Sequence, residues 1–314
     1  MGDHVSIVAL IELYNSLDKL DLRVLRVLEV AHSRYQYVPY KLIVKYMDAD
    51  ERKVGLALSK LNKLKLVQRA KSSYEGYRLT FNSYDILAIH TLRKAGKLLS
   101  LSPTPIGVGK ESVVYAGETP SGLRVAVKLH RTGTSSFVHV RKLRIFLGKR
   151  RHLTRLYEAR LSAYMEYAAL DAIFSEGGSV PEPIAYNRHA VVMRYVDGIE
   201  AYRAAEVSDA YIDDVKQTME IALRNGIIHG DLTPYNILLG DRAYVIDWPQ
   251  WVPVTHPNAN DILNRDLYNI YNYFSKFNKK INIEEILNIF DRVKESMTIK
   301  ARLSELVHKF IESL

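Results

Sequence analysis

Two aspartates and an asparagine in the second half of the chain form the strongest chemical signal in the sequence. Asp231 and Asn236 lie five positions apart in His229-Gly-Asp-Leu-Thr-Pro-Tyr-Asn236, and Asp247 follows the β-prone pair Val245-Ile246. Two carboxylates and an amide oxygen form an all-oxygen ligand set that suits Mg²⁺ or Mn²⁺. Phosphoryl transfer needs one carboxylate to orient the acceptor and further oxygen ligands to hold metal against the phosphates. The alternative is that Asp231 and Asn236 only cap local turns.

Two segments earlier in the chain could contact phosphate. Consecutive backbone N–H groups of a glycine-rich turn can cradle an anion, and such a turn is expected at Gly107, Val108, Gly109, Lys110, Glu111 and Ser112. Lys128 ends the apolar run Val125-Ala-Val, so its ammonium would lie near the core and need an anionic partner. Taken singly, the two segments also fit a plain hairpin and a lysine that reaches water.

The composition is that of an ordinary globular protein. Of 314 residues, 47% are hydrophobic and 25% are charged, which excludes wholesale disorder and collagen-like or coiled-coil sequence. The absence of cysteine excludes disulfides, a thiol nucleophile and a thiolate metal site. We expect a cytoplasmic location and no membrane association, since no targeting signal and no long apolar run is found. The net charge of +9 indicates a polyanionic partner.

The elements that must position these residues fall into two predicted domains. Residues 1–97 predict helices at 21–31, at 40–46 and after Asp48 or Asp50, followed by strands at 66–70 and 77–81. This order is typical of a winged helix-turn-helix, whose third helix would expose Arg52, Lys53, Lys60 and Lys63. A three-helix bundle with a solvated basic face is the alternative.

The second predicted domain covers residues 98–314. A connecting helix at 83–98 leads into a proline-containing stretch at 99–105, which fits a linker or strand entry. Strands at 113–116, 125–129, 190–195 and 242–246 and helical patterns after residue 153 predict a small β-rich lobe and a larger helical lobe. The expected fold class is therefore α+β, with a winged helix followed by a domain of two lobes.

Residues 131–152 form a second basic region. They begin with Thr and Ser residues and continue into six Arg and Lys residues between positions 141 and 151. We expect a phosphorylatable loop that can bind a polyanion, and a solvated surface loop is the alternative.

The order of these motifs resembles the protein-kinase-like superfamily. Within it, Gly107–Ser112, Arg188-His-Ala-Val-Val-Met193 and Ile246-Asp-Trp-Pro-Gln250 resemble the RIO family of atypical kinases. The winged-helix interpretation of residues 1–97 fits the RIO subfamily that carries such a domain. The resemblance implies an ATP-dependent serine/threonine kinase or ATPase that acts on the precursor of the small ribosomal subunit and its RNA, through the two basic regions.

The resemblance also implies a role for each matching residue. Asp231 would be the catalytic aspartate, Asn236 and Asp247 the metal ligands, and Asp247 a phosphoryl acceptor as well. Lys128 would contact the α- and β-phosphates of ATP, and Glu166 would pair with Lys128. The glycine-rich segment would cover the nucleotide, Met193 would flank the adenine, and backbone groups of Arg194 and Val196 would bond it.

Departures from ordinary protein kinases leave two other functions open. His229-Gly-Asp231 lacks the usual arginine, and no Ala-Pro-Glu follows Asp247, so the peptide-docking segment of those kinases is not expected. A phosphotransferase of the aminoglycoside or choline type shares the His-Gly-Asp and Ile-Asp motifs. A nucleic-acid-binding regulator that only senses nucleotide is the third possibility.

Overall fold

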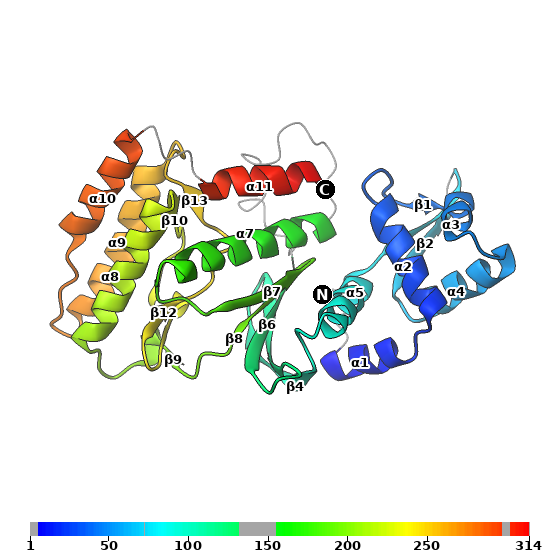
Figure 1. Cartoon of the computed structure of the whole chain (residues 1–314), viewed down its shortest axis with the longest axis horizontal. Coiled ribbons are helices and arrows are strands. Elements are labelled where there is room, and N and C mark those ends of the chain that lie inside the picture. The colour runs from blue at the N-terminus through cyan, green and yellow to red at the C-terminus, as the bar shows by residue number, and fades with distance from the viewer. Residues whose placement is uncertain (1–5, 72, 132–154, 297–301, 314) are drawn as a thin grey trace.

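The computed structural model describes residues 6–71, 73–131, 155–296 and 302–313. Its N-terminal part consists of helices and a small sheet, and its C-terminal part of a five-stranded sheet and a helical lobe (Figure 1). The predicted α+β fold class is confirmed. None of the helices among these residues is long and apolar enough to cross a membrane.

The N-terminal part has the element order of a winged helix-turn-helix. Its three-stranded antiparallel sheet has the order β1-β3-β2, and the α2 stripe of Val24, Leu25 and Leu28 is fully buried. Asp50 begins α4 by accepting the Lys53 N–H at 3.0 Å. The elements are α1 (Ile7–Asn15), α2 (Lys19–Ala31), β1 (Val38–Pro39), α3 (Tyr40–Met47), α4 (Glu51–Lys63), β2 (Val67–Lys71) and β3 (Glu75–Leu79).

Two expectations for this part need correction. The second wing strand ends at Leu79, because Ser83 Oγ accepts the Thr80 N–H at 3.2 Å and the next helix, α5 (Phe81–Lys94), begins there. Lys60 is half-buried and not fully exposed: its side chain keeps 40% exposure, but its ammonium contacts the buried Asp21 carboxylate at 2.5 Å. Arg52, Lys53 and Lys63 are exposed, as expected.

The central sheet is antiparallel, with the strand order β4-β5-β6-β8-β7. Most of the stretch expected to be a linker or strand entry forms the edge strand β4. Its pairing with β5 has register shifts on either side of Pro105. Proline is tolerated at such irregular positions of an edge strand. The strands are β4 (Ser100–Val108), β5 (Ser112–Glu118), β6 (Arg124–His130), β7 (Pro183–Asn187) and β8 (Ala190–Arg194).

Helix α7 (Arg155–Ser175) lies along this sheet, and the other helices of the C-terminal lobe lie beyond it (Figure 1). Short strands and 3-10 turns carry the motifs of the second half of the chain. These elements are β9 (Ile199–Glu200), η1 (Ala201–Arg203), α8 (Asp209–Arg224), β10 (Ile227–Ile228), η2 (Pro234–Asn236), β11 (Ile237–Leu239), β12 (Ala243–Val245), β13 (Val252–Pro253), α9 (Ala259–Ser275), α10 (Ile283–Glu295) and α11 (Arg302–Ser313).

Strand β6 separates two apolar cores, because successive side chains of a strand point to opposite faces. Val125, Val127 and Leu129 are fully buried in the core that also contains the apolar residues of the N-terminal part. Ala126, on the other face, packs against the core formed by α7 and the C-terminal lobe. Lys128 and His130 share that second face and therefore point toward α7.

Candidate active site

A cluster of charged side chains, buried except for Asp247, joins β6, α7 and the segment after β12. The Lys128 ammonium donates to Glu166 Oε1 at 2.7 Å and to Asp247 Oδ1 at 2.6 Å. His130 Nε2 lies 2.6 Å from the other Glu166 oxygen. The Lys128–Glu166 pair implied by the resemblance is thus present, and two of the three Lys128 N–H donors are used by these carboxylates.

The charges of this cluster stabilise one another. Burial alone would raise the pKa of Glu166, but the neighbouring Lys128 and His130 outweigh it and lower that pKa to about 2. Burial would also lower the pKa of Lys128, but the Asp247 and Glu166 carboxylates outweigh it and raise that pKa. Lys128 and Glu166 are therefore both charged near neutral pH.

The depressed pKa of Glu166 predicts how replacing it changes stability with pH. A carboxyl group whose pKa falls from 4.5 to about 2 on folding stabilises the fold fully above pH 4.5, and this stabilisation is lost as the pH falls toward 2. The Glu166→Gln substitution should therefore cost about 2 kcal/mol less free energy of unfolding at pH 3 than at pH 6. Urea unfolding of both proteins at the two pH values measures this difference.

Asp171→Asn, which removes an exposed carboxylate from the same helix, is the matched control. A cost of Glu166→Gln that stays constant or grows on acidification would contradict the charged cluster.

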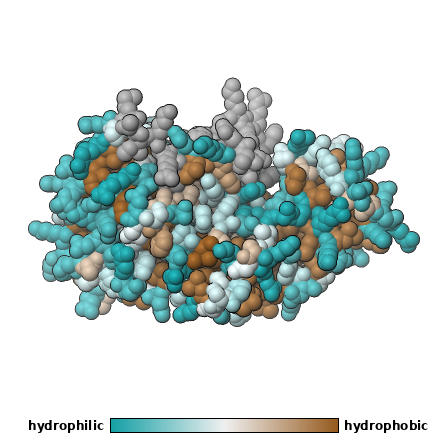
Figure 2. Space-filling model, in the orientation of Figure 1, coloured by the Kyte–Doolittle hydropathy of each residue, from teal (hydrophilic) through white to brown (hydrophobic). Residues whose placement is uncertain are grey.

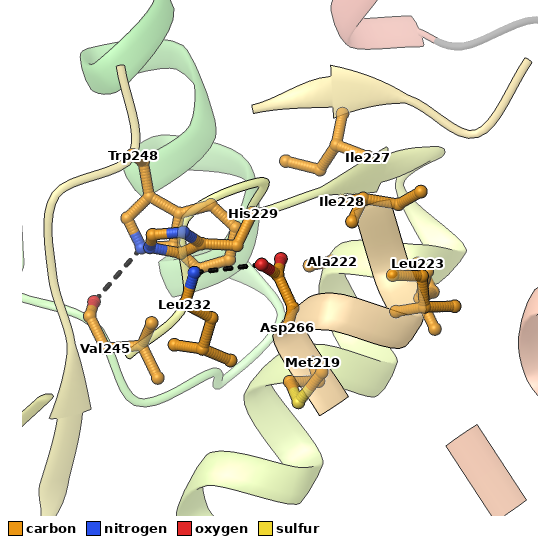
Figure 3. A pocket seen from close by; sticks show the side chains of 11 residues that line it. Met219, Ala222, Leu223, Ile227, Ile228, His229, Leu232, Val245, Trp248 and Asp266 are labelled. Carbon is orange, nitrogen blue, oxygen red and sulfur yellow. Dashed lines mark hydrogen bonds between the residues drawn. The ribbon is translucent and has the colours of Figure 1, made fainter. Parts of the chain in front are cut away.

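The loop that carries Asp231 and Asn236 is fixed from two sides. Asp266 on α9 accepts the N–H group of Leu232 at 3.1 Å (Figure 3). It also accepts the N–H group of Gly230 at 2.7 Å. The other side is held to the segment that leads into Asp247, since the Ile246 N–H donates to the Asn236 carbonyl at 2.9 Å. The Asp231 and Asp247 segments are therefore neighbours, as the phosphoryl-transfer interpretation requires.

The pocket in Figure 3 lies behind this loop and is lined mainly by apolar side chains. His229 and Trp248 meet at its edge with ring centroids 4.5 Å apart, and the Trp248 indole donates to the Val245 carbonyl at 3.0 Å (Figure 3). Burial raises the pKa of Asp266, although the nearby His229 and the hydrogen bonds from the two loop N–H groups act to lower it. The pocket lies on the core side of the loop, and none of the predicted site residues lines it.

The oxygen atoms near Asp247 fit a divalent metal ion. Asn236 Nδ2 donates to the Asp231 carbonyl at 2.8 Å, which leaves the amide oxygen as an acceptor. The Asp247 side chain is 43% exposed, and its second oxygen takes no hydrogen bond from any described residue. In the described part of the chain, no group of three His, Cys, Asp or Glu side chains could hold a metal alone. Mg²⁺ usually uses one or two protein carboxylates together with substrate phosphates, so the Asp247 carboxylate and the Asn236 amide oxygen suit it as donor types.

The glycine-rich segment covers the end of β4, the turn at residues 109–111 and the first residue of β5. The Gly109 N–H donates to the Ser112 carbonyl at 2.9 Å, Val108 is 73% exposed, and Gly109 and Lys110 are exposed beside it. Neither Gly107 nor Gly109 has a positive φ. The turn is accessible, and its contact with nucleotide stays a prediction.

The predicted adenine contacts lie at the end of β8. The side chain of Met193 is buried, opposite Ala126 of β6, and Val196 is half-buried. The Arg194 N–H donates to the Glu182 carbonyl at 2.8 Å, so Arg194 has only its carbonyl to offer a base. These contacts also stay predictions, and the rest of the basic region at 131–152 beyond Arg131 lies outside the described residues.

Two residues of the site, His130 and Asp266, were not predicted from the sequence. His130 follows Lys128 by two positions, so the period of a strand already places both on one face and could have indicated it. Asp266 lies in a helical stretch without a local motif, and nothing in the sequence links it to the Asp231 loop. Its role follows only from the packing of α9.

The fold defines a two-lobed, protein-kinase-like domain preceded by an N-terminal part of helices and a three-stranded sheet. Residues 113–286 match the RIO domain family, and residues 14–95 match the family described as Rio2, N-terminal. The chain belongs to the Rio2 family of RIO-type serine/threonine protein kinases.

Individual relatives agree with this assignment. The RIO-type serine/threonine-protein kinase Rio2 of Methanocaldococcus jannaschii is 36% identical over 84% of this chain and 98% of its own length. The serine/threonine-protein kinase rio2 of Dictyostelium discoideum is 34% identical over 83% of this chain, which spans half of that longer protein. The Rio2 kinase of Chaetomium thermophilum, in a complex with ADP, Mg²⁺ and phosphoaspartate, matches with a TM-score of 0.76 and 28% identity, covering 96% of this chain and 97% of that one.

Proposed function

We propose that this chain binds ATP with Mg²⁺ or Mn²⁺ and transfers the γ-phosphoryl group. The observation that carries the proposal is the buried Lys128 ammonium, which Glu166 holds from α7 and which contacts Asp247 beside the Asp231 loop. A buried cation with one remaining donor suits a phosphate oxygen. The complex of the Chaetomium thermophilum relative with ADP and Mg²⁺ supports the same ligands here.

Each residue of the site then has a task. Lys128 binds the α- and β-phosphates, while Gly107–Ser112 cover them and Met193, Arg194 and Val196 hold the adenine. Asn236 and Asp247 hold the metal ion, which neutralises charge on the phosphates. Asp231 orients the acceptor hydroxyl or water and accepts its proton.

We further propose that Asp247 is itself a phosphoryl acceptor. Its carboxylate oxygen attacks the γ-phosphorus, the bond from that phosphorus to the β,γ-bridging oxygen breaks, and ADP leaves. A carboxylate has no proton to lose in this step. Water then attacks the acyl phosphate, and inorganic phosphate leaves from a regenerated Asp247. The phosphoaspartate in the complex of the Chaetomium thermophilum relative supports this sequence of steps.

The proposed partner is the RNA of the maturing small ribosomal subunit in the cytoplasm. We assign its recognition to the winged-helix domain, residues 1–97, and to the basic region that begins at Arg131, within a kinase domain of residues 98–314. Arg52, Lys53 and Lys63 are exposed on α4, and hydrophilic side chains line the outer edges of both parts on the face in Figure 2. Binding through phosphate contacts should weaken steeply as salt rises.

The test is turnover of γ-³²P-labelled ATP by the full chain. We expect Mg²⁺-dependent hydrolysis and an acid-labile, hydroxylamine-sensitive label on the protein, since an acyl phosphate has those properties. Small-subunit ribosomal RNA should change the rate, and an aminoglycoside or choline should not.

A rate increased by an aminoglycoside or choline and unaffected by RNA would favour the small-molecule phosphotransferase. RNA binding without any Mg²⁺-dependent turnover or label would favour the nucleotide-sensing regulator.

A further inference from the structure

A buried carboxylate on α5 has no part in the site described so far. The side chain of Asp85 is 1% exposed, although it belongs to the helix that closes the winged-helix part. Asp85 Oδ2 accepts from Arg131 Nη2 at 2.5 Å, and Asp85 Oδ1 lies 2.6 Å from His189 Nε2. Arg131 directly follows β6 and His189 directly precedes β8, so this one carboxylate connects the two parts of the molecule.

His189 is held almost entirely by α5. It lies in the two-residue connection between β7 and β8 and is fully buried. The ring of Tyr84 stacks on it with centroids 4.9 Å apart, and Phe81 meets it edge-on at 6.2 Å. The position of this turn of the kinase sheet is therefore set by a helix of the N-terminal part.

Two chains of hydrogen bonds lead from Asp85 to the proposed nucleotide site. The first chain runs through His189, whose carbonyl accepts the His130 N–H at 2.8 Å. From there the His130 side chain contacts Glu166, and Glu166 accepts from Lys128. Through Arg131, whose backbone N–H donates to the Glu111 carbonyl at 2.6 Å, the second reaches the glycine-rich turn. Asp85 thus lies behind both the phosphate-binding lysine and the turn that covers the phosphates.

A second ion pair joins the same two parts through Arg188, the residue before His189. Glu29 on α2 accepts from Arg188 Nε and Nη2, each at 2.7 Å. The other Arg188 bonds go to the Leu87 carbonyl, to Thr91 on α5 and to the neighbouring Asn187. Glu29 is therefore a natural control for the effect of joining the two parts.

We propose that Asp85 is a positioning residue for nucleotide binding, acting through His130 and Arg131. Without its charge, the half-buried Arg131 guanidinium and the buried His189 imidazole lose their shared acceptor. The end of β6 then shifts, and with it the His130–Glu166–Lys128 geometry and the Glu111 turn. Because coupling between sites is reciprocal, nucleotide binding also favours the α5 position that Asp85 holds.

The experiment measures the Kd of a fluorescent ADP analogue with Mg²⁺ for the full chain carrying Asp85→Asn, Asp85→Ala or Glu29→Gln. The inference rests on the proposed nucleotide site, so Lys128→Met is included to test that site separately. We expect both Asp85 variants to raise the Kd by about 10-fold, within the range of roughly 2- to 30-fold typical of coupling residues, and Glu29→Gln to change it less than about 2-fold. The number of binding sites per folded protein should stay at the wild-type value.

A merely structural role for Asp85 would reduce the number of competent sites and leave the Kd of the folded fraction unchanged, which would overturn the proposal. An equal rise for Glu29→Gln would overturn it too, as would failure of both Asp85 variants to fold, because Asp85 would then serve the fold itself. Unchanged binding by Lys128→Met would instead contradict the proposed nucleotide site.

Discussion

Replacing Asp231 by asparagine should slow steady-state release of phosphate from ATP by about 100- to 10,000-fold, the usual contribution of a general base. The Asp231 carboxylate is exposed and accepts no hydrogen bond from any described residue, so it is available to an acceptor hydroxyl or water. Its backbone is fixed by the Asn236 amide and by Asp266 through the neighbouring N–H groups. Asparagine keeps that shape but cannot take a proton at pH 7. Steady-state kinetics with labelled ATP measures the loss.

The same variant separates the two half-reactions. Attack by the Asp247 carboxylate needs no proton removal, so a single-turnover label on Asp247 should persist in Asp231→Asn and decay more slowly than in the wild type. The Kd for Mg²⁺–ADP should stay within about 3-fold of the wild-type value, because Asp231 contributes little to ground-state binding. Asp241→Asn, which changes an exposed carboxylate in the loop between β11 and β12, is the control. Normal turnover by Asp231→Asn would remove Asp231 from the chemistry.

The sequence was sufficient for those parts of the site that depend on local pattern. The apolar run before Lys128 places that lysine at the inner end of a strand, and the period of the strand decides which face it shares. Even the pairing with Glu166 was expected, although the two residues are separated by 38 positions, because the order of motifs resembles a known family. The cap at Asp50 and the helix that begins at Tyr40 also follow from nearby residues.

The contacts of Asp85 could not have been predicted in that way. It meets His189 across 104 positions and Arg131 across 46, and neither pair follows a local period. Such contacts depend on how α5 packs against the sheet, where Val125, Val127 and Leu129 share one core with the winged-helix residues. The composition predicts a domain boundary near residue 97 and hence two separate domains. The apolar core, in contrast, contains residues from both sides of that boundary.

The error at Lys60 has the same origin. On a helical wheel Lys60 belongs to the basic face of α4, together with Lys53 and Lys63. In the folded chain its ammonium contacts Asp21 on α2 and also donates to the Ser16 carbonyl at 3.0 Å. Charge counts along one helix therefore overestimate the basic surface available to RNA whenever a neighbouring helix supplies a buried carboxylate.

Replacing Asp247 by alanine should abolish the protein-bound label and lower phosphoryl transfer by at least about 100-fold. A metal ion contributes several kcal/mol of transition-state stabilisation, and each 1.36 kcal/mol is a factor of ten in rate. Asp247 is proposed both as a metal ligand and as the phosphoryl acceptor. One of its oxygens lies 2.6 Å from the Lys128 ammonium, and the side chain presents its second oxygen to solvent. Its left-handed backbone, with φ at 68°, is a conformation that alanine adopts only at a cost, so Asp247→Asn, which tolerates that region better, is the companion variant.

The sharpest measurement on Asp247 is the ratio of the nucleotide Kd in EDTA to the Kd in Mg²⁺. If Asp247 is a metal ligand, this ratio should exceed one in the wild type and fall close to one in Asp247→Ala. Metal-free nucleotide should bind more tightly to Asp247→Ala than to the wild type. In the variant, Lys128 has lost a carboxylate that competes with phosphate for its N–H donors. The two effects have opposite signs, so a general loss of folding cannot imitate them. A ratio unchanged by the substitution would refute the ligand assignment, and an acid-labile label that survives it would place the acceptor elsewhere.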